Sequence, residues 1–201
     1  MKNIAVLASG QGSNLEAIFE AIERGEVAGR VVIVISDRAG APALGRAEKR
    51  NIKALFLDQK QFASREAYDR VLAAELKEMQ AELIVLAGFM RFLSPQFIDE
   101  FPMQIINIHP ALLPAFPGID GIEQAFNYGV KVTGCTVHFV DEGLDTGPVI
   151  LQSTVPVLQQ ETIETLEQRI HAAEHRTYST AIDLFCRDKL KVEGRRCLIV
   201  D

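Results

Sequence analysis

The chain has 201 residues, of which 48% are hydrophobic and 24% are charged, with a formal net charge of −6 at pH 7. This composition is typical of a soluble globular protein, and we expect one domain over residues 1–201 rather than a solenoid, a disordered chain or a collagen-like rod. The negative net charge does not favour binding to nucleic acid or to an acidic membrane surface, so small molecules are the expected partners. Three cysteines without metal-like spacing, and no signal or membrane segment, indicate the cytoplasm.

Short β-rich runs alternate with segments of helical period in the first part of the chain. The expected strands are 4–8, 31–36, 54–57, 83–87 and 105–109. The expected helices begin at Ser13 or Asn14 and end near Gly25, then follow at 42–50, 64–79, 95–101 and 120–128. This alternation predicts parallel strands joined by crossover helices. The continuous apolar runs at 31–35 and 83–87 indicate central strands buried on both faces.

The pattern changes after residue 130. Two longer strands, 133–140 and 149–155, are joined by a turn-rich loop, which predicts an antiparallel part of the sheet. A long helix over about 162–185 follows, and residues 189–201 can add an edge hairpin. The predicted fold class is therefore α/β, a Rossmann-like, mostly parallel sheet with helices on both faces and an antiparallel portion toward the C-terminus.

The first candidate site is Ser9-Gly10-Gln11-Gly12-Ser13-Asn14, between the first strand and the first helix. Glycines let backbone N–H groups approach an anion, and a helix N-terminus attracts it, so the segment indicates a phosphate site. A tight turn with a serine or asparagine cap explains the same residues equally well. A dinucleotide fingerprint needs a third glycine where Leu15 stands, which disfavours a nicotinamide dehydrogenase.

The second candidate site is Asn107 and His109, at the end of strand 105–109. Strand alternation places both side chains on one side, and Pro110 ends the strand. Ligands of open α/β sheets gather at this end of the strands. An amide and an imidazole there can both donate to one oxyanion, although a structural histidine is the alternative.

The third candidate site is the loop 141–148, which carries three carboxylates. Most such loops are surface turns. If strand 133–140 lies beside strand 105–109, however, one carboxylate can reach His109 and favour its protonated form.

The remaining titratable residues are expected to be structural. His138 lies in mid-strand, as a packing residue does, while His171 and His175 share a helix face without the spacing of a zinc protease. No metal site is therefore expected. Helical periodicity alone places four glutamates on a solvated face: Glu161, Glu164, Glu167 and Glu174.

Together, four segments of the chain resemble the phosphoribosylglycinamide formyltransferases of the formyltransferase family. They are 9–15, 86–93, 107–114 and 134–148, and the resemblance spans essentially the whole chain. Such enzymes move a formyl group from 10-formyltetrahydrofolate to the primary amine of glycinamide ribonucleotide in purine biosynthesis. The resemblance implies a mostly parallel sheet, a folate cosubstrate and no metal.

The resemblance also implies the residues of the site. The catalytic residues would be Asn107, His109 and Asp145. The ribonucleotide contacts would be Gly12, Ser13 and Asn14 at the phosphate, and Glu174. The folate contacts would be Arg65, Met90, Arg91, Phe92, Leu93, Asn107, Val140 and Asp141. The chain departs from many members at Ala111, Ala115 and Asp120, which bears on substrate contacts rather than on the reaction.

Related reactions remain as alternatives. A methionyl-tRNA formyltransferase is expected to carry an extra C-terminal domain and a basic surface, and a formyltetrahydrofolate hydrolase an N-terminal regulatory domain, neither of which we expect here. A non-catalytic nucleotide-binding module would have no reason to retain Asn107, His109 and Asp145 together. The sequence leaves both a monomer and a homodimer open.

Overall fold

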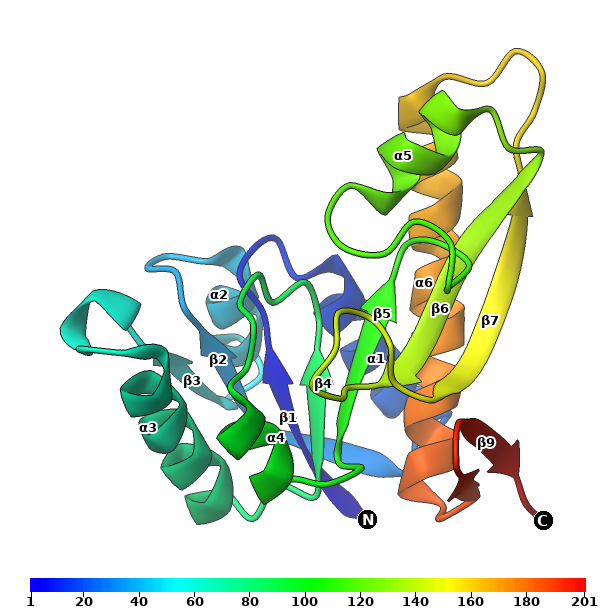
Figure 1. Ribbon diagram of the computed structural model, residues 1–201. Coiled ribbons are helices and arrows are strands. Elements are labelled where there is room, and N and C mark those ends of the chain that lie inside the picture. Colours follow the sequence, from blue (N-terminus) through cyan, green and yellow to red (C-terminus); the bar gives the residue numbers. More distant parts are fainter. The chain divides into compact units, whose positions relative to one another are not determined.

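The computed structural model describes residues 1–201. The chain divides into two compact units, residues 1–106 and 107–201, which are described in turn (Figure 1). Strand β5 (Ile105–His109) runs across the boundary between them. The single domain expected over residues 1–201 stays a prediction.

The first unit is a parallel sheet flanked by helices. Its strands are β1 (Lys2–Leu7), β2 (Gly29–Ser36), β3 (Lys53–Phe56) and β4 (Leu83–Leu86), in the order β3-β2-β1-β4. Its helices are α1 (Ser13–Glu23), α2 (Pro42–Glu48), α3 (Arg65–Glu78) and α4 (Pro95–Glu100). Helices α1 and α2 pack on one face and α3 and α4 on the other (Figure 1). The predicted parallel arrangement is confirmed, since β1 pairs in parallel with both β2 and β4.

The second unit contains the antiparallel region. Strand β6 (Val132–Phe139) pairs antiparallel with β7 (Val149–Pro156), and the hairpin of β8 (Leu190–Glu193) and β9 (Arg196–Ile199) joins the free edge of β7. The long helix α6 (Ile163–Cys186) packs on β6 and β7, and α5 (Gly121–Tyr128) packs on α6. The antiparallel portion and the edge hairpin are confirmed, as is the mixed, mostly parallel fold class.

Capping residues explain most of the small differences at helix ends. The side chain of Ser64 accepts the Ala67 N–H at 3.2 Å, and Thr162 forms a capping box with Thr165, so each stands just before its helix. Gly25 adopts a left-handed conformation (φ 75°) just after α1, as expected of a helix-ending glycine. The short 3₁₀ helix η1 (Gln59–Gln61) was not predicted, because it lacks an apolar period.

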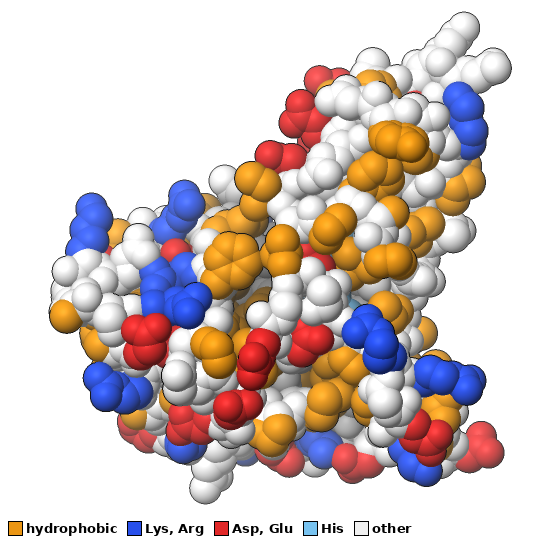
Figure 2. All heavy atoms as spheres, in the orientation of Figure 1, with side chains coloured by type: hydrophobic (Ala, Val, Ile, Leu, Met, Phe, Trp, Pro, Cys, Tyr) orange, Lys and Arg blue, Asp and Glu red, His pale blue; other side chains and the backbone are white.

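The surface in Figure 2 is of mixed character. On the face shown, Lys and Arg side chains stand in small groups among acidic and hydrophobic side chains. None of the helices is both long enough and apolar enough to cross a membrane.

Candidate functional site

The turn between β1 and α1 has the backbone of an anion site. Gly12 is the residue before the helix and is left-handed (φ 71°, ψ 37°), and no side chain caps the helix there. The helix begins at Ser13, as expected, and the alternative of a serine or asparagine cap is not found. A helix N-terminus of this kind presents N–H groups and a partial positive charge to an anion.

Helix α2 holds this turn in place. The Ala43 N–H donates to the carbonyl oxygen of Gly10 at 3.3 Å, and Nε of Arg46 donates to that of Gln11 at 2.9 Å. A Cβ at Gly12 would lie 3.0 Å from Cβ of Ala43, so the left-handed conformation and the close packing both require glycine. The turn thus has one defined shape.

Ser9 connects the end of β1 to the segment that follows β4. Its hydroxyl donates to Oδ1 of Asp37 at 2.6 Å and accepts the Met90 N–H at 2.9 Å. Met90 and Phe92 are 68% and 67% exposed, whereas Leu93 is buried. Two exposed apolar side chains on an anchored backbone are suited to flank a flat ring.

The other residues that the resemblance implies for folate binding are divided between the two units. Arg65 is exposed at the first position of α3, and the guanidinium of Arg91 lies 4.2 Å from the centre of the Tyr68 ring. In the second unit, Val140 and Asp141 are half-buried at the start of the loop after β6.

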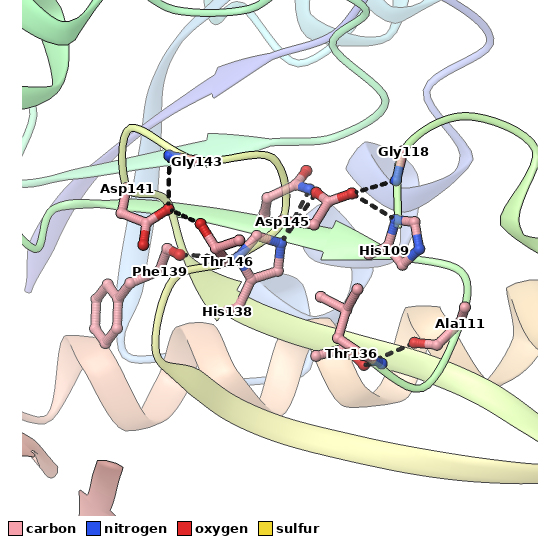
Figure 3. Close-up of polar contacts among 12 residues, drawn as sticks. His109, Ala111, Gly118, Thr136, His138, Phe139, Asp141, Gly143, Asp145 and Thr146 are labelled. Atoms are coloured by element: carbon pink, nitrogen blue, oxygen red, sulfur yellow. Dashed lines mark hydrogen bonds and ion pairs between the residues drawn. The ribbon is translucent and has the colours of Figure 1, made fainter. Parts of the chain in front are cut away.

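In the second unit Asp145 lies beside His109, a contact that the sequence left conditional on the position of strand 133–140 (Figure 3). Nδ1 of His109 lies 3.4 Å from Oδ2 of Asp145, and the ring is buried. Its Nε2 donates to the carbonyl oxygen of Phe116 at 2.7 Å. Because each ring nitrogen faces an oxygen acceptor, a ring protonated on both nitrogens satisfies both contacts.

The contact of His109 with the carbonyl of Phe116 was not expected from the sequence. Nε2 is already engaged, and a Cβ at Gly121 would lie 3.1 Å from it, so the start of α5 packs against the ring. Access of another hydrogen-bond acceptor to Nε2 therefore requires displacement of the Phe116 carbonyl.

Asp145 is held from several directions. Its Oδ2 accepts the Gly118 N–H at 2.8 Å, and its side chain is 12% exposed. Burial raises the pKa of Asp145, but hydrogen bonds from His138 and Gly118 and the charge of the two neighbouring histidines outweigh burial and bring the pKa below its usual value. Asp145 is thus ionised at neutral pH.

His138 is a site residue that the sequence analysis missed. It was expected only to pack, but its Nε2 lies 3.3 Å from Nδ2 of Asn107 and 3.6 Å from Oδ1 of Asp145 (Figure 3). The signal was present in the sequence: a buried imidazole in an otherwise apolar strand needs polar partners. The structure therefore joins four side chains in the series Asn107, His138, Asp145 and His109.

The position of the protons on the His138 ring determines whether its Nε2 accepts from Asn107 or donates to Asp145. Nδ1 donates to the carbonyl oxygen of Phe139 at 2.8 Å, so Nδ1 carries a proton. In the neutral ring, Nε2 then accepts from the Asn107 amide and fixes its orientation. When Nε2 also carries a proton it donates to Oδ1 of Asp145 instead, which is the hydrogen bond that lowers the pKa of that carboxyl.

The loop that carries Asp145 is internally hydrogen-bonded. Oδ1 of Asp141 accepts the Gly143 N–H at 3.1 Å and the Thr146 hydroxyl at 2.6 Å (Figure 3). The carbonyl of Thr146 accepts from Arg195, in the turn between β8 and β9, at 2.8 Å. These bonds flank Asp145 on both sides and define its backbone, which is left-handed at φ 53°.

The glutamates of the C-terminal helix are not all solvated. Glu164 and Glu167 are exposed, as periodicity predicted, but Glu174 is buried and accepts from His171 at 2.9 Å. Glu161 precedes the helix and is paired with Arg169 at 2.6 Å. The prediction of one solvated face is therefore wrong for Glu161 and Glu174. No group of three or more His, Cys, Asp or Glu side chains is arranged to hold a metal ion.

The lowered pKa of Asp145 predicts an acid-dependent loss of stability. A carboxyl with a depressed pKa in the folded chain contributes stability that is fully present above its unfolded pKa of about 3.9 and is lost as the pH falls through the lower folded value. In urea unfolding at a series of pH values, the wild type should therefore lose stability relative to Asp145→Asn below about pH 4. Parallel pH profiles for the two proteins would contradict the lowered pKa.

The chain is similar in sequence and in fold to known proteins. A family model described as formyl transferase matches residues 2–182. The phosphoribosylglycinamide formyltransferase of Bacillus subtilis is 43% identical over 182 residues, which are 90% of this chain and 93% of that protein. The crystal structure of glycinamide ribonucleotide transformylase 1 from Symbiobacterium toebii is 50% identical, with a TM-score of 0.97 over 100% of this chain and 95% of the other.

A longer relative contains the same region. The trifunctional purine biosynthetic protein adenosine-3 of Drosophila pseudoobscura is 47% identical over 192 residues, 94% of this chain, but the chain spans only 14% of that protein's length. The match of the family model over most of the chain, together with these relatives, shows that the chain belongs to the formyl transferase family.

Proposed function

We propose that the chain transfers the formyl group of 10-formyltetrahydrofolate to the primary amine of glycinamide ribonucleotide, yielding N-formylglycinamide ribonucleotide and tetrahydrofolate in purine biosynthesis. The observation that carries this proposal is the contact between His109 and Asp145, 3.4 Å apart, with Asn107 joined to Asp145 through His138. The names of the similar proteins supply the substrate class.

In the proposed reaction the substrate amine attacks the formyl carbon. A bond forms between that nitrogen and the formyl carbon, and negative charge develops on the formyl oxygen. The Asn107 amide and Nε2 of His109 donate hydrogen bonds to this oxygen, the latter after releasing the carbonyl of Phe116. Each donor is expected to lower the barrier by about 3 kcal/mol, by analogy with oxyanion-hole donors in other enzymes.

Collapse of the intermediate breaks the bond between the formyl carbon and the folate nitrogen. The proton lost by the amine ends on that folate nitrogen, and Asp145 assists this transfer through water. Asp145 also keeps the ring of His109 oriented, since its carboxylate faces Nδ1.

The binding roles we propose follow the resemblance to the formyltransferases. The ribonucleotide is bound by Gly12, Ser13, Asn14 and Glu174, and the folate by Arg65, Met90, Arg91, Phe92, Leu93, Asn107, Val140 and Asp141. The expected partners are these two small molecules, in the cytoplasm. A monomer and a homodimer both suit this function, because one chain supplies Asn107, His109 and Asp145.

Gly12→Ala is expected to raise the KM for glycinamide ribonucleotide by about tenfold or more, with the KM for folate unchanged. The added Cβ lies 3.0 Å from Cβ of Ala43 and forces the left-handed turn to change shape. Steady-state kinetics with each substrate varied in turn measures the effect. Gly25→Ala is the matched control, since Gly25 is also left-handed but has no atom within 4 Å of an added Cβ. Equal changes in both KM values would argue that the Gly12 turn is only structural.

The proposed function is tested by following folate absorbance with the purified chain. Tetrahydrofolate should form when glycinamide ribonucleotide is present and should not form when it is omitted. Formation at the same rate without the amine would identify a hydrolase instead, and no reaction in either case would identify a non-catalytic module.

A further inference from the structure

Helix α6 carries a histidine whose contact fixes a buried carboxylate. Glu174 is 3% exposed, and its Oε2 lies 2.9 Å from Nδ1 of His171, one helical turn earlier. Nε2 of the same ring lies 3.5 Å from Oε1 of Glu167. His171 therefore stands between one buried and one exposed carboxylate, with its own side chain 42% exposed.

We propose that His171 is a positioning residue that orients Glu174 for binding of the ribonucleotide. This inference rests on the proposed function, in which Glu174 contacts that substrate. His171 itself touches no reacting atom in this account.

The direction of the hydrogen bond follows from the chemistry of the two groups. An ionised carboxylate only accepts hydrogen bonds, so Nδ1 of His171 donates to Glu174. The hydrogen bond to Glu174 raises the pKa of His171, burial opposes it, and the charges of Glu174 and Glu167 raise it further, so the pKa lies above its usual value. A charged donor makes the shorter and stronger kind of hydrogen bond.

This bond restricts the carboxylate of Glu174. It holds Oε2 at 2.9 Å from Nδ1 of His171. A glutamate has three rotatable side-chain bonds, and fixing them before the substrate arrives removes an entropic cost from binding. Loss of His171 should therefore weaken substrate binding rather than slow the chemical step.

The kinetic test compares His171→Ala with wild type. The KM for glycinamide ribonucleotide should rise about tenfold, as expected for losing a hydrogen bond to a charged group, while kcat and the KM for folate stay within about twofold. His171→Gln restores an N–H donor and should recover most of the lost affinity. Glu167→Gln is the matched control, because it removes the exposed partner of His171 and leaves the bond to Glu174 intact.

A second measurement detects the contact between His171 and Glu174 without an activity assay. The ring of His171, followed by NMR during a pH titration, should show a lower pKa in Glu174→Gln than in wild type, because the charged partner is gone. An unchanged titration would overturn the proposal, as would an unchanged KM for the ribonucleotide in His171→Ala while formyl transfer proceeds normally. Wild-type chain without any formyl transfer would overturn the proposed function, and this inference with it.

Discussion

Replacing Asp145 with asparagine is expected to lower kcat at least about a hundredfold, with little change in either KM. Asparagine has nearly the shape of aspartate but no charge. Oδ2 of Asp145 faces Nδ1 of His109 at 3.4 Å and also accepts the Gly118 N–H, so the variant loses the negative charge beside His109 while the loop keeps its fold. Proton transfer and orientation are then impaired together. Steady-state kinetics at several pH values measures the loss.

The control for this substitution is Asp99→Asn, an equivalent change at an exposed position of α4. It should leave both the rate and the stability at wild-type values. Near-normal kcat in correctly folded Asp145→Asn would remove Asp145 from the mechanism.

Gly147→Ala is expected to lower both stability and activity. A Cβ at this position would overlap the carbonyl oxygen of Phe139, a backbone atom that cannot rotate away. That oxygen accepts from Nδ1 of His138, so moving it also disturbs the ring that contacts Asn107 and Asp145. The free energy of unfolding should fall by about 2–4 kcal/mol and kcat by about tenfold or more.

Denaturant unfolding and the formyl-transfer assay together check this prediction. Gly45→Ala is the matched control, because an added Cβ inside α2 meets no atom within 4 Å and should stabilise the chain by up to about 1 kcal/mol. Wild-type stability and rate in Gly147→Ala would show that the loop tolerates a different path.

The fold could be predicted because burial leaves a periodic trace in the sequence. Strand β1 is completely buried from Ile4 to Leu7, and β2 lies between two other strands, so both appear as continuous apolar runs. The ends of helices were less exact, since Ser64 and Thr162 cap their helices from outside while still fitting the helical pattern. Whether a residue caps a helix or belongs to it depends on its backbone angles, which the spacing of apolar residues does not reveal.

The geometry of the candidate site could be predicted only in part. Asn107 and His109 share a strand, so their placement follows from alternation, whereas Asp145 was assigned through the resemblance and meets His109 only in the folded unit. The contact of Nε2 of His109 with the Phe116 carbonyl was not predictable, because it depends on a loop with Phe116 in a left-handed conformation.

Burial of single polar groups was the main error. His138 was assigned to packing and Glu174, on periodicity alone, to a solvated face, yet both are buried and hydrogen-bonded to other polar side chains. A polar residue at an apolar position of a strand or helix can be tolerated, paired or functional, and periodicity does not separate these cases. Only the hydrogen-bond partner of the polar residue distinguishes these cases, and that partner lies elsewhere in the chain or one helical turn away.

The most direct test of the central claim follows the formyl carbon itself. Donor folate labelled with a carbon isotope in its formyl group should yield labelled N-formylglycinamide ribonucleotide with the wild-type chain, one label for each tetrahydrofolate released. Label that appears only as free formate, or that stays on the folate, would contradict the account.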